Sequence, residues 1–266
     1  MFLKAVFFGI VEGITEFLPI SSTGHLILAN RIIDPFKDPI FTNAFNVIIQ
    51  LGAILAVIYL FWDKLWIFKD LKLKTNTFLL WLKILVAVLP AAVIGFLYDD
   101  IISTKLSGIG VVAIAWIFYG IILILIENWL KRSNKKQAVE NTQDISWLNA
   151  LIMGVFQCLA LIPGTSRSAA TIIGGLLLGL SRPVAAEFSF FLAIPTMCGA
   201  ALLKLLKAGG GISLHGWLII FTGFVVSFLT AMIVIRLFMD YIRKHNFKIF
   251  GWYRIILGLI VLLFLR

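Results

Sequence analysis

The chain has 266 residues, of which 61% are hydrophobic and 14% are charged, and its mean hydropathy is +1.03. Soluble domains are about 45–50% apolar and about 25% charged, so this composition excludes a soluble globule, a disordered chain and a coiled coil. The net charge of +10 is typical of basic loops that face the cytoplasm and anionic lipids, and no nucleic-acid partner is expected. The composition predicts a polytopic membrane protein, and long apolar runs without alternation favour helices over a β-barrel.

Ten apolar segments follow one another along the chain, and four of them are too short to cross a membrane, which takes about 20 residues. The short segments form two pairs, 3–18 with 24–33 and 147–162 with 169–180, and a proline interrupts each pair, Pro19 or Pro163. The other six segments are predicted to be transmembrane helices: 41–62, 78–97, 107–130, 184–203, 214–239 and 247–265.

Loop charge predicts the sidedness of these segments. The loops 63–77 and 131–146 each hold four basic residues, and two spans separate them, so both are expected in the cytoplasm. The loop between them, with Asp99 and Asp100, is then outside. The basic residues within 243–248 are also cytoplasmic only if each short pair enters and leaves the membrane on one side, as a re-entrant helical hairpin.

One hairpin followed by three spans therefore occurs twice, with opposite orientation. The predicted fold is an all-α polytopic membrane protein with six transmembrane helices plus two re-entrant helical hairpins in an inverted-topology repeat. The repeats cover approximately residues 1–130 and 147–266 of a single membrane domain. Inverted repeats with broken helices place a site near the membrane midplane, where irregular backbone needs cover from protein or a wet cavity. Residues 19–25 and 163–171 are expected to face each other across one polar cavity.

Glu12 and Glu16 are the most informative residues of the first hairpin. Their i, i+4 spacing places both carboxylates on one face of a helix, inside an apolar run. Two like charges buried there cost several kcal/mol unless a divalent cation, an arginine or a shared proton compensates them. The alternative is a wet surface helix with solvated carboxylates, and the flanking phenylalanines argue against it.

The turn after Pro19 is rich in small and polar residues: Ser21, Ser22, Thr23, Gly24 and His25. Serine, threonine and glycine suit a turn and the N-cap of the next helix, and free N–H groups at a helix N-terminus bind anions. His25 can act near neutral pH as an acid, a base or a nucleophile. The alternative for this turn is a helix cap with a hydrogen-bonded histidine.

The second turn holds a similar set: Gly164, Thr165, Ser166, Arg167, Ser168 and, one helical turn further on, Thr171. Arg167 is the only basic residue between Ser146 and Leu180, and a lone arginine between apolar helices is typical of a functional site. A guanidinium binds phosphate oxygens bidentately, and the glycine and hydroxyls beside it supply more donors. The alternative is a structural arginine paired with Glu12 or Glu16, and both interpretations can hold, since an empty site needs a counter-ion.

Two further glutamates have weaker signals. Glu187 lies at the start of a predicted span, where it either caps the helix or completes the cavity. Glu127 lies near a helix end, four residues before Lys131, and this spacing predicts an ordinary ion pair.

The combined inventory is two carboxylates, several hydroxyls, one histidine and one arginine. This set suits phosphoryl transfer, which needs a cation clamp, a nucleophile, an acid or base, and stabilisation of negative charge. Because the site is expected inside a membrane, the phosphate is expected to be carried by a lipid.

These stretches resemble the signatures of the undecaprenyl-diphosphate phosphatase family, which is also called the bacitracin-resistance family. The first stretch, Glu12 to His25, reads E-G-I-T-E-F-L-P-I-S-S-T-G-H, and the second, Pro163 to Thr171, reads P-G-T-S-R-S-A-A-T. Two shorter stretches, 157–161 and 187–190, are also similar, and the resemblance covers essentially the whole chain. Ala169 is a departure, because the family often has glycine there.

The resemblance implies removal of the terminal phosphate from undecaprenyl diphosphate, which regenerates the monophosphate carrier lipid for cell-wall synthesis and confers bacitracin resistance. It also implies dependence on a divalent cation, Mg²⁺ or Ca²⁺, and a multi-pass protein of the bacterial plasma membrane whose site faces outside. Contacts with membrane lipids are expected, and a homodimer is left open.

The resemblance also implies roles for residues of this chain. Glu12 and Glu16 would hold the cation or act as acid and base. Ser22 or His25 would be the nucleophile, or His25 would activate Ser22 or a water; attack by Ser22 with help from His25 is favoured. Arg167 would bind the diphosphate together with other residues of the two turns: Ser21, Thr23, Gly164, Thr165, Ser166, Ser168 and Thr171. The rival function is a transporter or flippase of polyprenyl phosphate lipids, since inverted hairpins are typical of transporters.

Overall fold

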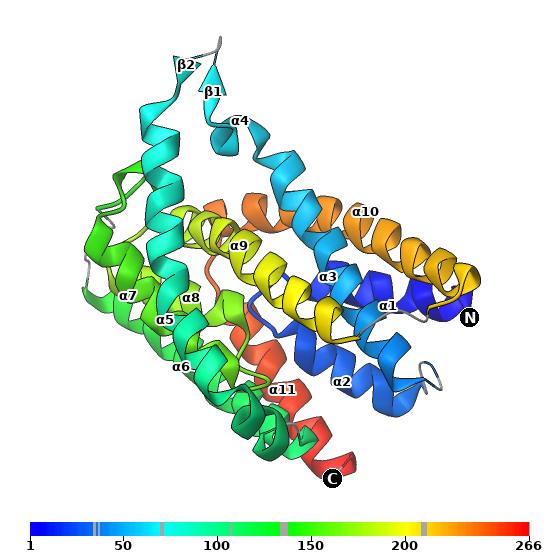
Figure 1. The fold of residues 1–266 in the computed structure, drawn as a ribbon. Helices are drawn as coiled ribbons and strands as arrows, with labels where there is room; N and C mark the ends of the chain where they lie inside the picture. The colour runs from blue at the N-terminus through cyan, green and yellow to red at the C-terminus, as the bar shows by residue number, and fades with distance from the viewer. Residues whose placement is uncertain are drawn as a thin grey trace.

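The structure is a computed structural model and describes residues 1–33, 36, 38–69, 72–106, 108–133, 138–208 and 212–265. Helices make up nearly all of it (Figure 1). In chain order the elements are α1 (Phe2–Thr15), α2 (Ser22–Ile32), α3 (Pro39–Leu60), α4 (Trp62–Leu65), β1 (Phe68–Lys69), β2 (Lys72–Leu73), α5 (Thr75–Lys105), α6 (Ile109–Ser133), η1 (Thr142–Asp144), α7 (Trp147–Gln157), η2 (Cys158–Leu161), α8 (Arg167–Leu177), α9 (Arg182–Ala208), α10 (Leu214–Lys244) and α11 (Lys248–Phe264).

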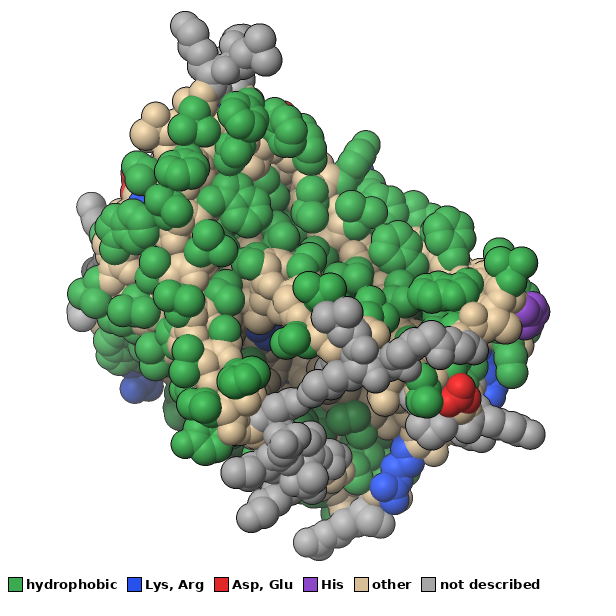
Figure 2. All heavy atoms as spheres, in the orientation of Figure 1, with side chains coloured by type: hydrophobic (Ala, Val, Ile, Leu, Met, Phe, Trp, Pro, Cys, Tyr) green, Lys and Arg blue, Asp and Glu red, His purple; other side chains and the backbone are tan. Residues whose placement is uncertain are grey.

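Five helices are long and apolar enough to cross a membrane: Ile40–Leu60, Thr75–Tyr98, Ile109–Ser133, Arg182–Leu203 and Leu214–Lys244. They correspond to five of the six predicted spans, so the chain is a multi-pass helical membrane protein. The sixth predicted span is α11, which has 17 residues and carries Arg254 in its middle. Much of the face in Figure 2 is covered by apolar side chains, as lipid contact requires.

Several predicted boundaries differ from the structure. The predicted outer loop around Asp99 and Asp100 is the end of α5, which continues as a helix to Lys105. The basic segment 63–77 contains a short antiparallel pair, β1 and β2, that projects from one end of the molecule (Figure 1). Residues 134–137 of the predicted basic loop lie outside the described residues.

The two short pairs, α1 with α2 and α7 with α8, each end their first helix several residues before the proline. Proline disfavours helical backbone at the residue before it, and it has no N–H to continue the ladder. The second helix of each pair then begins after a serine N-cap with positive φ, Ser21 at 75° and Ser166 at 76°. Their hydroxyls accept hydrogen bonds from the backbone N–H of Gly24 (3.3 Å) and Ala169 (3.2 Å). Both turns therefore fold alike.

Long helices surround these two turns. α3 packs against α9 and α10, α6 packs against α11, α1 lies along α10, and α7 lies along α5. Small residues permit the close crossings, as in other membrane proteins. A Cβ added to Gly154 of α7 would lie 2.2 Å from the carbonyl oxygen of Ala87 on α5. The turns are consequently enclosed by packed helices.

Two polar clusters join helix ends at one end of the molecule, and both correct the sequence analysis. Glu187 neither caps a helix nor lines the cavity: it bonds Lys64 at 2.7 and 2.8 Å and accepts from the Thr142 hydroxyl at 3.1 Å. Glu127 pairs with Arg182, at 2.9 and 2.5 Å, instead of with the predicted Lys131. The Glu127 carboxylate is buried and needs a partner inside the protein, so a residue from another helix replaces its neighbour on the helix surface.

Candidate active site

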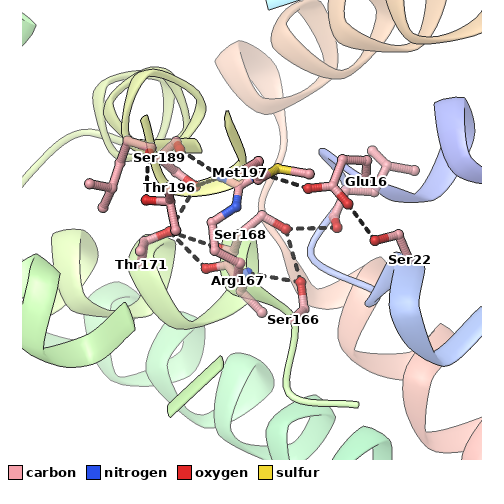
Figure 3. Close-up of polar contacts among 12 residues, drawn as sticks. Glu16, Ser22, Ser166, Arg167, Ser168, Thr171, Ser189, Thr196 and Met197 are labelled. Atoms are coloured by element: carbon pink, nitrogen blue, oxygen red, sulfur yellow. Dashed lines mark hydrogen bonds and ion pairs between the residues drawn. The ribbon is translucent and has the colours of Figure 1, made fainter. Parts of the chain in front are cut away.

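Polar side chains of the two turns contact each other (Figure 3). Nη2 of Arg167 lies 3.0 Å from Oε1 of Glu16, and the Ser168 hydroxyl donates to the carbonyl oxygen of Leu18 at 2.9 Å. These contacts join residues about 150 positions apart in sequence. The expected approach of residues 19–25 to residues 163–171 is therefore observed.

Arg254 of α11 forms hydrogen bonds with both turns, and it was not among the predicted site residues. Its side chain is fully buried and donates to the carbonyl oxygens of Pro19 (3.1 Å), Gly164 (2.8 Å) and Thr165 (2.9 Å). It also donates to two carbonyls of α6, those of Ala115 and Trp116. The signal was present, because an arginine in the middle of an apolar segment marks a functional or structural site by itself.

The Arg167 side chain, about one-eighth exposed, is held in one orientation by three partners. Besides the contact to Glu16, Nη1 donates to the carbonyl oxygen (2.6 Å) and the hydroxyl (3.2 Å) of Ser189 on α9. The guanidinium also lies 6.0 Å from the centre of the Phe17 ring, in cation–π range. Nε has no partner among the described residues. The side chain is thus preorganised and retains an N–H for a ligand.

Hydroxyl groups surround Arg167 (Figure 3). The hydroxyls of Ser166 and Ser168 are 2.9 Å apart, and Thr171 donates to the hydroxyl of Ser189 at 2.7 Å. Thr165 is fully buried, and its hydroxyl has no partner among the described residues. Ser189 was not predicted as a site residue, although it lies within the stretch 187–190 that carries the resemblance.

The carboxylates of Glu12 and Glu16 are buried, with exposed fractions of 0% and 8%, which excludes a wet surface helix. Glu16 bridges two groups, because its Oε1 contacts Arg167 and its Oε2 accepts the hydroxyl of Ser22. Glu12 lies against Glu16, and neither of its carboxylate oxygens has a hydrogen-bond partner among the described residues. One guanidinium faces two carboxyl groups, so the pair needs a proton or a cation in addition.

His25 contacts the backbone of the first turn and the side chain of a residue on α11. Nδ1 is 2.7 Å from the carbonyl oxygen of Ser21, and Nε2 is 2.7 Å from the hydroxyl of Tyr253 on α11. Among the described contacts, neither ring nitrogen forms a hydrogen bond with Ser22, whose hydroxyl donates to Glu16 instead. Thr23 is exposed on the first turn of α2.

The two glutamates are the candidate ligands for a metal ion. The described residues contain no group of three or more histidine, cysteine, aspartate or glutamate side chains that could hold a metal. The chemistry nevertheless fits a hard divalent cation, which takes oxygen ligands. Glu12 offers two buried carboxylate oxygens without partners, and Glu16 lies beside it. Glu12 and Glu16 could therefore provide carboxylate ligands for such a cation.

The hollow in the face of Figure 2, near the lower ends of α5 and α9, has a basic side chain at its base. A multi-pass membrane protein with a buried arginine, unpartnered carboxylate oxygens and hydroxyls at the meeting of two broken helices is a protein built to bind an anionic group inside the membrane. The model of the family described as bacitracin resistance protein BacA matches residues 5–260. The chain therefore belongs to that family, and the resemblance in its sequence is confirmed.

Curated relatives agree with the family. The chain is 54% identical over 262 residues to undecaprenyl-diphosphatase 1 of Clostridioides difficile (strain 630), covering 97% of this chain and 94% of that protein. It is 51% identical over 267 residues to an undecaprenyl-diphosphatase of Enterococcus faecalis, covering 98% and 96%. It is 54% identical over 263 residues to an undecaprenyl-diphosphatase of Fusobacterium nucleatum, covering 98% and 99%. These similarities extend over nearly the whole length of each chain.

Proposed function

We propose that this chain hydrolyses undecaprenyl diphosphate to undecaprenyl phosphate and inorganic phosphate, and so recycles the cell-wall carrier lipid and confers bacitracin resistance. One observation carries the proposal: Glu16 contacts both the Ser22 hydroxyl and Arg167, so a nucleophile, a base and a phosphate-binding cation meet at one point. The identity of about half the residues to undecaprenyl-diphosphatases supports the choice of substrate.

Ser22 is the nucleophile and Glu16 its base. As Oγ of Ser22 bonds to the terminal phosphorus, its proton passes to Glu16, the acceptor that it already contacts. The bond from that phosphorus to the bridging oxygen breaks, and undecaprenyl phosphate leaves with the electron pair on that oxygen. The departing lipid phosphate takes the proton from Glu16. Water then hydrolyses the phosphoserine: its oxygen bonds to phosphorus, the bond from phosphorus to Oγ breaks, and one of its protons restores the hydroxyl of Ser22. This geometry favours Glu16 as the partner of Ser22 over the predicted help from His25.

Arg167 has two roles that follow each other. In the free protein it is the counter-ion of Glu16. An arriving diphosphate competes for the guanidinium, whose orientation Ser189 maintains, and its oxygens are neutralised as charge develops in the transition state. Glu16 loses its counter-charge at that moment and becomes a better proton acceptor. The ion pair with Arg167 thus keeps the buried carboxylate of Glu16 neutralised until the diphosphate binds.

Glu12, with Glu16, would hold a divalent cation, Mg²⁺ or Ca²⁺. Such an ion supplies neutralisation of the diphosphate oxygens when it is bound. The buried and unpartnered oxygens of Glu12 support this assignment. The other hydroxyls of the two turns, among them Thr165 with its free hydroxyl, line the place where the diphosphate binds.

The predicted topology belongs to the same proposal. α11 is the sixth span, and the α1–α2 and α7–α8 pairs are re-entrant hairpins of an inverted repeat covering approximately residues 1–130 and 147–266. The similar positive φ angles of Ser21 and Ser166 support the repeat, and Gln157 precedes Ser166 by as many residues as Glu12 precedes Ser21. The first helix of each hairpin packs on a long helix of the other repeat: α1 packs on α10, and α7 packs on α5. This reciprocal packing is expected of such a repeat. The basic loops then face the cytoplasm, and the site opens outside.

A detergent assay tests the function. Purified protein without a membrane gradient should release phosphate from undecaprenyl diphosphate, lose this activity in a chelator and regain it when Mg²⁺ or Ca²⁺ is added. Binding of the lipid diphosphate without phosphate release, with the cation present, would contradict the proposal and favour the transporter or flippase. Substitution of Glu12 by glutamine should abolish the response to the cation while the protein remains folded.

A further inference from the structure

Tyr253 and His25 form a pair that the proposed reaction does not yet use. Tyr253 directly precedes Arg254 on α11, and its hydroxyl lies 2.7 Å from Nε2 of His25. The two ring planes are nearly parallel, at 9°, with their centroids 5.7 Å apart. Trp116 of α6, which is fully buried, lies against the same imidazole with a centroid distance of 5.0 Å. Side chains of α6 and α11 thus both contact His25 of α2.

The partners of the imidazole determine its tautomer. The carbonyl oxygen of Ser21 can only accept, so Nδ1, 2.7 Å away, carries the hydrogen. In the neutral ring Nε2 is then the acceptor, and the hydroxyl of Tyr253 donates to it. A hydroxyl can also accept, so Tyr253 remains a partner when His25 gains a proton. A phenylalanine at 253 would preserve the ring and remove only this contact.

We propose that Tyr253 is a positioning residue for the phosphatase reaction: its hydroxyl, together with the carbonyl oxygen of Ser21, fixes the ring orientation and the Nδ1–H tautomer of His25, so that Nε2 is kept as a proton acceptor at the edge of the site. The inference rests on the proposed function. Tyr253 is 43% exposed, so the pair lies at the surface of the protein and not in its packed interior. The cation beside the pair, Arg254, is committed to backbone carbonyls and does not compete for Nε2.

Nitrogen-15 NMR of histidine-labelled protein in detergent tests the geometry without any activity. The wild-type signal of His25, identified by its loss in His25→Gln, should be that of a neutral ring with the hydrogen on Nδ1. In Tyr253→Phe it should shift toward a mixture of tautomers. The matched control is Tyr241→Phe, because Tyr241 stacks on His245 with centroids 4.6 Å apart but contacts it through a backbone carbonyl. That control should leave the signals of His25 and His245 unchanged.

Kinetics tests the consequence for the reaction. Tyr253→Phe should lower kcat about tenfold and leave KM nearly unchanged, since the substitution disturbs an acid–base group and not a phosphate contact. In the His25→Gln background the same substitution should have no further effect. Equal effects in both backgrounds, or a wild-type ring with the hydrogen on Nε2, would overturn the inference. Absence of phosphatase activity in the wild type would instead refute the proposed function, and the NMR result would still decide the geometry.

Discussion

At the scale of single residues, the proposed reaction depends most on the contact between Arg167 and Glu16. A buried ion pair gains little net stability, because desolvation of both charges offsets their attraction. Here the pair has further support, since Ser189 holds the guanidinium and Ser22 donates to the carboxylate. In the proposed reaction, this arrangement holds the cation, the base and the nucleophile in position before the substrate arrives.

Arg167→Ala should lower kcat/KM about 10²–10³-fold, equivalent to about 3–4 kcal/mol of transition-state stabilisation, because the phosphate loses its principal donor. Phosphate release by the purified variant measures this, and its elution from a sizing column reports folding. Arg243→Ala is the matched control, since Arg243 is 62% exposed in its pair with Asp240. Near-normal turnover by Arg167→Ala would refute the role of Arg167.

Ser22→Ala should abolish turnover, because no phosphoserine can form. Acid quenching of the wild type with substrate labelled in the terminal phosphate should trap label on the protein, and the variant should trap none. Ser133→Ala, on the end of α6, should behave as the wild type does. Residual single-turnover release by Ser22→Ala, with His25 intact, would assign the attack to His25 or to water.

At the scale of elements, Glu127 links three helix ends. It accepts from Arg182 at the start of α9 and from the backbone N–H of Phe247, at 3.0 Å, before α11. Its exposed fraction is 1%, so little water can replace either contact. The positions of α6, α9 and α11, and with them Arg254 and Ser189, depend on this carboxylate.

Glu127→Ala should destabilise the protein by about 3 kcal/mol, because it leaves a guanidinium and a buried N–H without their acceptor. Thermal unfolding in detergent, followed by tryptophan fluorescence, should show a lower midpoint. Asp240→Ala, which removes the exposed partner of Arg243, should leave the midpoint unchanged. Equal midpoints for the two variants would show that the Glu127 cluster does not stabilise the helix ends.

At the scale of the whole molecule, the ion pairs at one end of the helices agree with the charge of the loops there. Lys64 of the first basic loop reaches Glu187, and Arg182 reaches Glu127, so the ends of α4, α6 and α9 lie on one side. The positive-inside rule predicts that this side is the cytoplasm, and that the opposite ends of α5 and α6 lie outside.

The sidedness can be tested by labelling single cysteines in intact cells, after Cys158 and Cys198 have been replaced by serine. A membrane-impermeant maleimide should label Gly108→Cys, between α5 and α6, without permeabilisation. Lys244→Cys, at the end of α10, should be labelled only after the cells are opened. The reverse pattern would contradict the predicted orientation.

The sequence predicted the site residues that carry their own signal. Glu12, Glu16 and Arg167 are charges inside apolar runs, and a buried charge needs a reason wherever it occurs. Five spans could be predicted because hydropathy depends on composition alone. The partner of Glu127 could not be predicted, since helix spacing reveals neighbours on one helix but not contacts between helices. Ser189 and Tyr253 were missed for the same reason: they reach the site only through the packing of α9 and α11.

Arg254 has a consequence for how the protein can be assembled. The guanidinium of Arg254, near the C-terminus, donates hydrogen bonds to backbone carbonyls of both turns. Glu16 and Ser22 come from the first half of the chain, and Arg167 comes from the second. In the proposed reaction, neither half alone holds the base, the attacking hydroxyl and the phosphate-binding cation together. Synthesis must therefore be nearly complete before catalysis can begin, and a truncated translation product lacking α11 would be inert while still inserting its earlier helices.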